Sequence, residues 1–281
     1  MNPKYQLAEM TWPEVREAAA AGRVVLQPVA AIEQHGLHLP VDTDNLIVTR
    51  MCEAAAERYP DEFVVSPCVP FGFNDHNMEF PGTISISPET LLAFYVDLGK
   101  SLITNGFRRV LFVNGHGSND TIVQLASRRI NNETPGWAAV TGQYYLATWV
   151  NQRERLRTSP PRGVGHACEF ETSFYLHLRG DLVQMDKAVD ENTRGHPVFD
   201  DHDWEASPPM RFMNWWSQRS RSGVEGAPSH ATAEKGERLF EGCVALLVEI
   251  ARALRDMELP DRVDHRPDGA WPGGLKWPID A

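Results

Sequence analysis

Short apolar runs alternate with longer amphipathic stripes along this chain, and the two patterns predict different elements. Apolar runs at residues 23–30, 63–67 and 109–113 predict strands buried on both faces, and a run at 137–146 is interpreted as a fourth strand. The first and third of these strands are each followed by a polar loop and then by a helical pattern. This repetition predicts an α/β fold, with a mainly parallel sheet in the middle of a three-layer α/β/α arrangement.

Helices are predicted where apolar residues recur every three or four positions. Proline near the start, as at Pro13 and Pro88, and glycine just beyond the end, as at Gly22 and Gly106, are typical of helix boundaries. The predicted helices cover residues 11–21, 45–58, 87–105, 121–130, a segment that ends at Leu178, and 231–254.

The chain contains no internal repeat, and we expect a single domain over residues 1–281. Residues 186–222 are polar and rich in proline and tryptophan, which we interpret as an ordered insertion or flap on that domain. Residues 255–281 show no periodicity, so we expect an irregular C-terminal tail there.

Composition narrows the possible partners. A chain of 281 residues that is 42% hydrophobic can bury an ordinary core, and its net charge of −11 with scattered basic residues argues against nucleic acid as a partner. The sequence has no apolar run of 18 residues and no basic start followed by an apolar stretch, so we expect neither membrane insertion nor secretion. Four cysteines without a CxxC motif are typical of reduced residues in a cytoplasmic protein.

The loop after the first predicted strand contains several metal-binding side chains, namely Glu33, His35 and Asp44. These oxygen and nitrogen donors suit a divalent Zn, Mn or Fe ion. His116 and Glu171 occupy comparable places at predicted strand ends, and a parallel sheet would bring such loops to one edge. Five donors exceed the needs of one zinc, and an aspartate can bridge two ions, so the pattern predicts a dinuclear site with Asp44 in the middle. The alternative for Asp44 is a capping acid in the first turn of a helix.

Several segments in combination resemble the creatininase (creatinine amidohydrolase) family. The matching segments are 33–40 with 43–44, 114–119, 166–173, 80–83 and 231–236. The resemblance runs from the first helix to about residue 255, which is nearly the whole chain. It implies an α/β protein with two divalent ions (Zn, Mn or Fe) per chain, a small-molecule substrate, and hydrolysis of C–N bonds other than ordinary peptide bonds. It also implies a homo-oligomer, often a hexamer.

Position by position, the resemblance assigns roles to the candidate donors. It implies that Glu33 and His116 bind one ion, that His35 binds the other, and that Asp44 bridges the two. It further implies that His166 shuttles the proton.

The fifth protein ligand is the point at which this chain departs from the family pattern. Creatininase has a glutamate at the metals two places after the histidine of its Asn-Gly-His segment, and this chain has Ser118 there. We expect Glu171 to supply the missing carboxylate. Glu169 is the rival, because it would lie one helical turn from His166 on the same face.

The residues expected around the substrate also differ. Creatininase holds the creatinine ring with a Trp-Asp pair, where this chain has Arg162 and Gly163. An arginine could meet a carboxylate or phosphate, which favours an anionic amide, lactam or formamide over creatinine, although Arg162 could equally cap a surface loop.

The remaining polar candidates are assigned to the pocket or to the support of the ligands. Asn74, His76 and Ser118 are expected to line the pocket, with a structural role as the alternative for His76. His38 and Glu169 are expected to orient ligands through hydrogen bonds. The tryptophans at 215 and 216 could close over the substrate or pack at a subunit contact.

These expectations combine into one mechanism with several alternatives. A hydroxide held between the two ions would attack an amide carbon, and His166 would protonate the leaving nitrogen. The alternatives are a metal-dependent deformylase, a peptidase acting on a modified peptide, a lyase or isomerase on the same scaffold, and a catalytically silent metal-binding protein. A nucleotide site at 114–119 is disfavoured because the segment lacks a third glycine.

Overall fold

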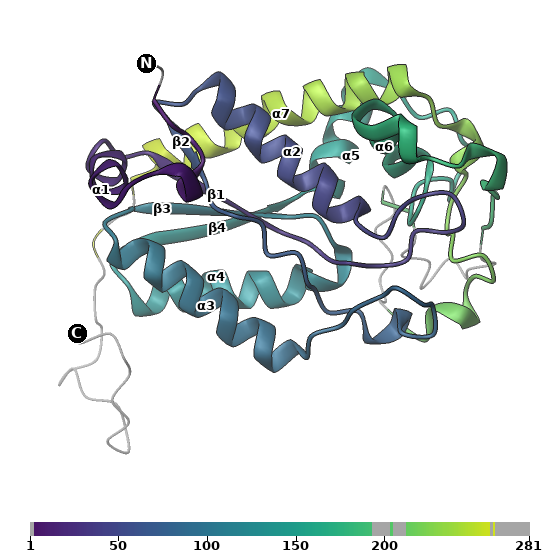
Figure 1. Ribbon diagram of the computed structural model, residues 1–281, viewed down its shortest axis with the longest axis horizontal. Helices are drawn as coiled ribbons and strands as arrows, with labels where there is room; N and C mark the ends of the chain where they lie inside the picture. Colours follow the sequence, from purple (N-terminus) through teal and green to yellow (C-terminus); the bar gives the residue numbers. More distant parts are fainter. Residues whose placement is uncertain (1–2, 193–202, 205–211, 259–260, 262–281) are drawn as a thin grey trace.

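A four-stranded parallel sheet forms the centre of the protein (Figure 1). The computed structural model describes residues 3–192, 203–204, 212–258 and 261. The strands are β1 (Val24–Val29), β2 (Phe63–Val65), β3 (Arg109–Asn114) and β4 (Trp137–Gly142), in the spatial order β2-β1-β3-β4. All three strand pairs are parallel, and Leu26 of β1 lies opposite Val65 on one side and Leu111 on the other. The predicted α/β fold with a parallel sheet is confirmed.

Helices cover both faces of the sheet (Figure 1). One layer contains α2 (Thr43–Arg58), α5 (Gln143–Glu154), α6 (Glu169–Arg179) and α7 (Ala233–Asp256), and the other contains α3 (Pro88–Thr104) and α4 (Asp120–Glu133). The remaining helix, α1 (Trp12–Ala20), packs with the second layer through Ala18 and Ala19. Single 3-10 turns lie at Leu7–Glu9, Asp75–Asn77, Gly117–Asn119, Gly180–Leu182, Met185–Lys187, Trp216–Gln218 and Pro228–His230.

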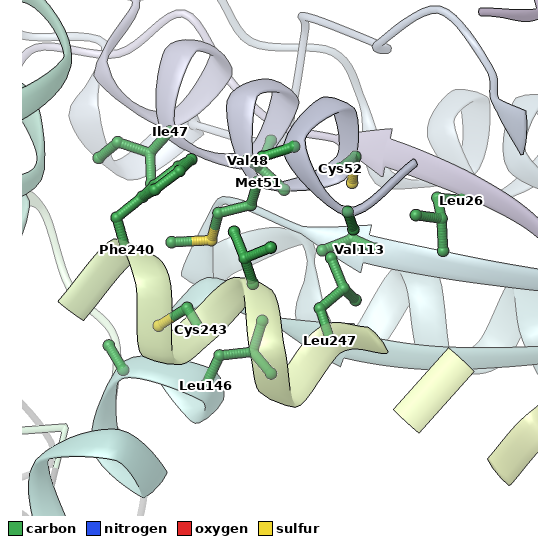
Figure 2. Packing of buried hydrophobic residues seen from close by; sticks show 14 of the residues in the cluster. Leu26, Ile47, Val48, Met51, Cys52, Val113, Leu146, Phe240, Cys243 and Leu247 are labelled. Carbon is green, nitrogen blue, oxygen red and sulfur yellow. The ribbon is translucent and has the colours of Figure 1, made fainter. Parts of the chain in front are cut away.

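Alternate strand residues feed two separate cores, because successive side chains point to opposite faces of a sheet. Leu26 and Val113 belong to the larger core, together with Met51 of α2 and Leu247 of α7 (Figure 2). The second core lies beneath α3 and α4 and includes Val25, Val29, Tyr95, Val110, Phe112, Val123 and Ile130. The continuous apolar pattern of the strands therefore reflects burial on both faces.

Polar side chains fix the helix starts that the sequence predicted. The Ser87 hydroxyl accepts a hydrogen bond from Thr90 N at the start of α3, and the Thr232 hydroxyl accepts one from Lys235 N at the start of α7. Helix α2 begins at Thr43, so Asp44 lies in its first turn, as expected.

The predicted strand over 137–146 is wrong in its second half. Strand β4 ends at Gly142, and Gln143 begins helix α5. Leu146, Ala147 and Val150 are buried at helical spacing against the larger core. The apolar run therefore contains the end of a strand and the start of a helix, and the change of period within it was not recognised.

Much of the predicted insertion at 186–222 and most of the predicted tail at 255–281 lie outside the described residues. Helix α7 continues to Asp256, two residues beyond its predicted end. All four cysteines are free, and Cys52, Cys168 and Cys243 are buried. Within the described residues, none of the helices has the length and apolar character needed to span a membrane.

Candidate metal centre

Four of the five predicted donors come from the carboxyl edge of the central strands. Glu33 and His35 lie in the loop between β1 and α2, and Asp44 lies in the first turn of α2. His116 lies just after the end of β3, in the loop before α4. Gly36 has a φ of 66°, and a Cβ there would come within 2.5 Å of a Val224 methyl group, so the tight loop requires glycine.

The fifth donor reaches the same place by a different route. Glu171 lies in the first turn of α6, and no strand immediately precedes that helix in the described chain. The expectation that Glu171 follows a strand end is therefore wrong. Helix α6 is held above the sheet by its long contact with α7.

The five side chains form two groups of closely spaced donors that share Asp44. In the first group, His116 Nδ1 lies 2.9 Å from Glu33 Oε2 and 3.1 Å from Asp44 Oδ2. In the second, His35 Nε2 lies 3.3 Å from Asp44 Oδ1 and 3.9 Å from Glu171 Oε1. All five side chains are at most 5% exposed. Within each group the donor atoms lie within 4.8 Å of one another, so each group could hold one ion.

Backbone carbonyls set the orientation of both histidines. His35 Nδ1 lies 3.1 Å from the carbonyl oxygen of Glu33, and His116 Nε2 lies 3.1 Å from that of Phe73. A neutral imidazole that donates from one nitrogen presents a lone pair at the other. His35 Nε2 and His116 Nδ1 therefore point lone pairs at carboxylate oxygens, an arrangement that a cation between them would stabilise.

Several buried atoms at the centre make no hydrogen bond, although they approach one another closely. These atoms are Glu33 Oε2, His35 Nε2, Asp44 Oδ2 and Glu171 Oε2. A buried polar atom without a partner costs free energy, and three buried carboxylates side by side also repel one another. The other oxygen of Glu33 accepts a short hydrogen bond from Asn77 Nδ2, which fixes its orientation. These buried atoms therefore lack partners within the protein, and bound metal ions would supply them.

The pKa values of the cluster without metal also reflect the repulsion between its buried carboxylates. Burial, with a further contribution from Asp44 and Glu33, raises the pKa of Glu171 to about 7 although His35 opposes the shift. The carboxylates of Asp44, Glu171 and Glu33 raise the pKa of His35 to about 10 against the effect of burial. In the absence of metal, protons would therefore occupy the place of cations.

His166, to which the family resemblance assigns proton transfer, lies at the rim of the cluster. Its ring centroid is 4.3 Å from that of His35 and 4.9 Å from that of Trp216. Burial, and then the neighbouring His35, lowers the pKa of His166 to about 4. Its Nε2 lies 2.8 Å from the carbonyl oxygen of Gln34.

Glu169 does not join the donors, contrary to its assignment as a ligand rival or a supporting group. Its carboxylate forms a buried ion pair with Lys235 and accepts hydrogen bonds from the backbone of Thr158 and Ser159. Glu169 begins helix α6 whereas His166 precedes the helix, so the two do not share a helical face. The helix start was placed too early in the sequence interpretation.

His38 is buried near the cluster but hydrogen-bonds Thr172 rather than one of the five donors. Its Nε2 lies 2.8 Å from the Thr172 hydroxyl. The expected direct contact with a ligand is therefore absent from its described contacts.

A cavity of about 330 Å³ opens above the two donor groups. His76 and Ser118 line it as predicted, and His76 Nε2 lies 3.5 Å from the Ser118 hydroxyl. Arg162 and Asn74 are not among its lining residues. The Arg162 backbone N–H donates to Asp203, and the Asn74 side chain donates to the carbonyl of Ile84, which is a contact within its own loop.

Sequence reasoning missed several residues that shape the site. Asn77 and Gln34 hold the loop that carries Glu33, since Gln34 Nε2 lies 3.2 Å from Asn77 Oδ1 and 3.1 Å from the carbonyl oxygen of Gly223. The missed lining residues are Asp120, Gln143, Tyr144, Tyr145, Asp203, Trp204, Met213 and Glu225. The Asn77 contact had no signal in the sequence, whereas Tyr144 and Tyr145 would have been found if the strand end at Gly142 had been recognised.

Comparison with known proteins identifies the family of this chain. The family model for creatininase, described as creatinine amidohydrolase, matches residues 8–251. The chain is 31% identical over 274 residues to creatinine amidohydrolase from Pseudomonas putida, covering 91% of this chain and 98% of that protein. It is 33% identical over 223 residues to the mycofactocin precursor peptide peptidase of Mycolicibacterium smegmatis, covering 77% of this chain and 79% of that protein.

A solved structure described as creatininase Mn superimposes with a TM-score of 0.77 at 26% identity, over 90% of this chain and all of that chain. The family match extends across both groups of donors and nearly all of the described fold. This protein therefore belongs to the creatininase family and is a metal-dependent hydrolase of that family.

Proposed function

We propose that this protein is a dinuclear metal-dependent amidohydrolase that cleaves a C–N bond other than an ordinary peptide bond. The observation that carries the proposal is the pair of donor groups, Glu33/Asp44/His116 and His35/Asp44/Glu171, which share one carboxylate. Glu33 and His116 would hold one ion, His35 and Glu171 the other, and Asp44 would bridge them. Zn, Mn or Fe suits this set of nitrogen and oxygen donors.

Two divalent ions in this place would supply a water that is deprotonated near neutral pH and a positive charge that polarises the amide carbonyl. The protein's own contribution is to orient these donors without further movement. Asn77 holds one Glu33 oxygen, and backbone carbonyls hold both histidine rings. Such contacts keep the ligand atoms in place before the substrate arrives.

His166 is proposed as the group that moves the proton to the leaving nitrogen. Its Nε2 lies 2.8 Å from the Gln34 carbonyl oxygen and 3.1 Å from Gln34 Nε2. Because Gln34 Nε2 already has acceptors in Asn77 and Gly223, the bond to the carbonyl decides the tautomer, and Nε2 carries the hydrogen. Nδ1 is then the basic nitrogen of His166, and the lowered pKa keeps it free to accept a proton.

Metal analysis of purified protein tests the dinuclear part of this proposal. We expect about two ions per chain in the wild type and loss of metal in Glu33→Ala and His116→Ala, because each variant removes a donor from the first group. Glu9→Ala, a substitution at an exposed position of the 3-10 turn Leu7–Glu9, is the matched control and should keep both ions. Fewer than one ion per chain, unaffected by Glu33→Ala, would reject the proposal.

Steady-state assays with lactams, cyclic ureas and formamides test the chemistry, with Mn or Zn added to chelated protein. Hydrolysis that depends on added metal and disappears in His166→Ala with the metal content unchanged is the expected result. Peptide cleavage is the second candidate, because one relative at 33% identity is described as a precursor peptide peptidase. A short peptide in the same panel separates the two activities.

The assembly, the domain organisation and the location of the protein stay predictions. We propose a homo-oligomer built from single-domain chains, as the family resemblance implies. Light scattering during size-exclusion chromatography gives the number of chains, and a monomer at micromolar concentration would contradict the prediction. Cell fractionation tests the expected cytoplasmic location.

A further inference from the structure

The cavity above the metal centre is lined by acidic, aromatic and histidine side chains. Its carboxylates are Glu33, Asp44, Asp120, Glu171, Asp203 and Glu225. Lysine and arginine are absent from the lining, among the residues that the structure describes. An anionic substrate, which Arg162 suggested in the sequence, would therefore find neither lysine nor arginine in the described lining of the cavity. The carboxylates of the lining favour a cationic substrate instead.

Not all of these carboxylates are available to a substrate. Glu33, Asp44 and Glu171 belong to the proposed metal ligands, and Asp203 is paired with Arg157, whose Nη2 lies 2.7 Å from Asp203 Oδ2. Asp120 is different, because its described contacts are hydrogen bonds from neutral side chains. Its negative charge is thus supported but not neutralised by those contacts.

Two tyrosines orient Asp120 from the start of helix α5. The Tyr144 hydroxyl donates to Asp120 Oδ1 at 2.7 Å, and the Tyr145 hydroxyl donates to Asp120 Oδ2 at 3.2 Å. Strand β4 ends at Gly142 beside the end of β3, so the first turn of α5 meets the first turn of α4, where Asp120 lies. The sheet edge that carries the metal donors therefore carries this group as well.

The same tyrosines form an aromatic corner with Trp204. The ring centroids of Tyr144 and Tyr145 are 4.3 Å apart, and those of Tyr144 and Trp204 are 6.1 Å apart in an edge-to-face arrangement. Tyr145 is 49% exposed, so its ring is accessible from the cavity that it lines. We call Asp120, Tyr144, Tyr145 and Trp204 the aromatic corner.

An aromatic ring attracts a cation to its face, and a nearby carboxylate adds a direct electrostatic attraction. Ammonium and guanidinium groups combine both interactions, since they donate hydrogen bonds to the carboxylate and are attracted to the ring faces, and the guanidinium is the more weakly hydrated of the two. A carboxylate on the substrate would instead meet like charge from Asp120, which is a means of rejecting such a substrate.

We propose that the aromatic corner binds a cationic group of the substrate, so that the substrate is an amide, lactam or formamide carrying an ammonium or guanidinium group away from the bond that is cleaved. This proposal rests on the proposed function, because it assigns the substrate class for the same cavity. The metal centre acts on the C–N bond, and the aromatic corner selects the charge at the other end.

Three primary amides of similar length test the proposal by titration calorimetry. They are 4-guanidinobutanamide (cationic), pentanamide (neutral) and glutaramate (anionic). On metal-loaded protein we expect 4-guanidinobutanamide to bind about tenfold more tightly than pentanamide, and glutaramate to bind more weakly than either. Equal binding of all three amides, or a preference for glutaramate, would overturn the proposal.

Variants identify the corner as the source of the preference. Asp120→Asn and Tyr145→Leu should reduce the preference for 4-guanidinobutanamide over pentanamide to less than about threefold, because the cationic amide loses more affinity than the neutral one. Asp97→Asn, an exposed position on α3, is the matched control and should keep the preference. Tyr145→Leu provides a second measurement if Asp120→Asn does not fold, since Tyr145 is half exposed. A preference that survives in Tyr145→Leu and in folded Asp120→Asn would refute the role of the corner.

These titrations, together with the metal analysis and the steady-state assays described above, separate this proposal from the proposed hydrolysis. Protein that prefers the cationic amide but neither binds two ions nor cleaves any amide would retain the corner and reject the hydrolase. Protein that cleaves amides with metal but shows no preference by charge would retain the hydrolase and reject the corner.

Discussion

Replacement of Lys235 by methionine should separate the structural role of Glu169 from a catalytic one. Glu169 is fully buried, Lys235 is 8% exposed, and the two form an ion pair between α6 and α7. Burial alone would raise the pKa of Glu169, but hydrogen bonds from Lys235 and from residues Thr158 and Ser159 outweigh it and lower the pKa. Lys235→Met therefore leaves a buried carboxylate without its cation.

The cost can be estimated from the contacts that remain. Removing one partner of a buried ion pair destabilises a protein by about 3–5 kcal/mol. Glu169 keeps hydrogen bonds from Thr158 N at 2.9 Å and Ser159 N at 3.0 Å, so we expect the lower end of that range, about 3 kcal/mol. A large domain loses about 2–4 °C of melting temperature for each kcal/mol of destabilisation, so the melting temperature should fall by about 6–12 °C.

Melting curves of metal-loaded protein at pH 7, together with metal analysis and steady-state kinetics below the transition, provide the measurement. Arg179→Met changes the last residue of α6 and breaks an exposed ion pair with Asp181 in the next turn, so it is the control and should change the melting temperature little. Glu169→Gln in the Lys235→Met background should recover part of the loss, because the uncompensated charge disappears.

Acid should reduce the difference between Lys235→Met and the wild type. A carboxyl whose pKa is lowered on folding contributes stability above its unfolded value, and this stability is lost as the pH falls through the folded value. The advantage of the wild type should therefore shrink below pH 4.5, the ordinary value for glutamate. A Lys235→Met protein that melts with the wild type but has lost its kcat would show that Glu169 acts in the chemistry, and the structural assignment would fail.

Three further changes test the surroundings of the metal centre. Asn77→Ala removes the hydrogen bond that orients Glu33 and should weaken metal affinity by about 10–100-fold in competition with a chelating dye, whereas unchanged affinity would contradict the positioning role. Gly236→Ala places a Cβ 1.9 Å from a backbone oxygen of α6 and should cost about 3 kcal/mol in urea denaturation, while Gly180→Ala, with nothing within 4 Å, should be tolerated. Burial and nearby carboxylates raise the pKa of Glu171 from 4.5 to about 7 without metal, so the melting temperature of chelated protein should fall as the pH rises through this interval, and a parallel curve for metal-loaded protein would refute the argument.

The elements with a single clear period were predictable from the sequence. Strand β3 and helix α3 lie within a residue or two of their expected bounds, because burial on both faces gives an unbroken apolar run and a helix between Pro88 and Gly106 has clear boundary signals. Helix α5 was missed because Leu146 continues the apolar run of β4, and a short apolar run does not distinguish strand from helix.

The candidate donors were found because they cluster in short segments, but their surroundings depend on contacts between distant segments. Asn77 lies 44 positions from Glu33, and nothing in its neighbourhood marks it as a partner of that carboxylate. The choice between Glu169 and Glu171 required the start of α6, since a shift of two residues moves a side chain to a different helix face. Arg162 looked like a substrate contact because sequence position says nothing about which side of a loop faces the cavity.

The two donor groups depend on different elements of the fold, so damage to one helix contact need not affect both groups equally. Glu33, Asp44 and His116 come from the sheet edge and the start of α2, whereas the second group needs Glu171 from α6. The position of α6 is set by its contact with α7. This contact includes the ion pair of Glu169 with Lys235 and the close approach of Gly236 to the backbone of Ser173. Damage to the α6–α7 contact should therefore release the ion held by His35 and Glu171 before the other, because Asp44 alone cannot compensate for the loss of Glu171. Metal titrations of Lys235→Met should accordingly show one ion bound as in the wild type and one bound more weakly, and equal weakening of both would mean that the two groups behave as a single site.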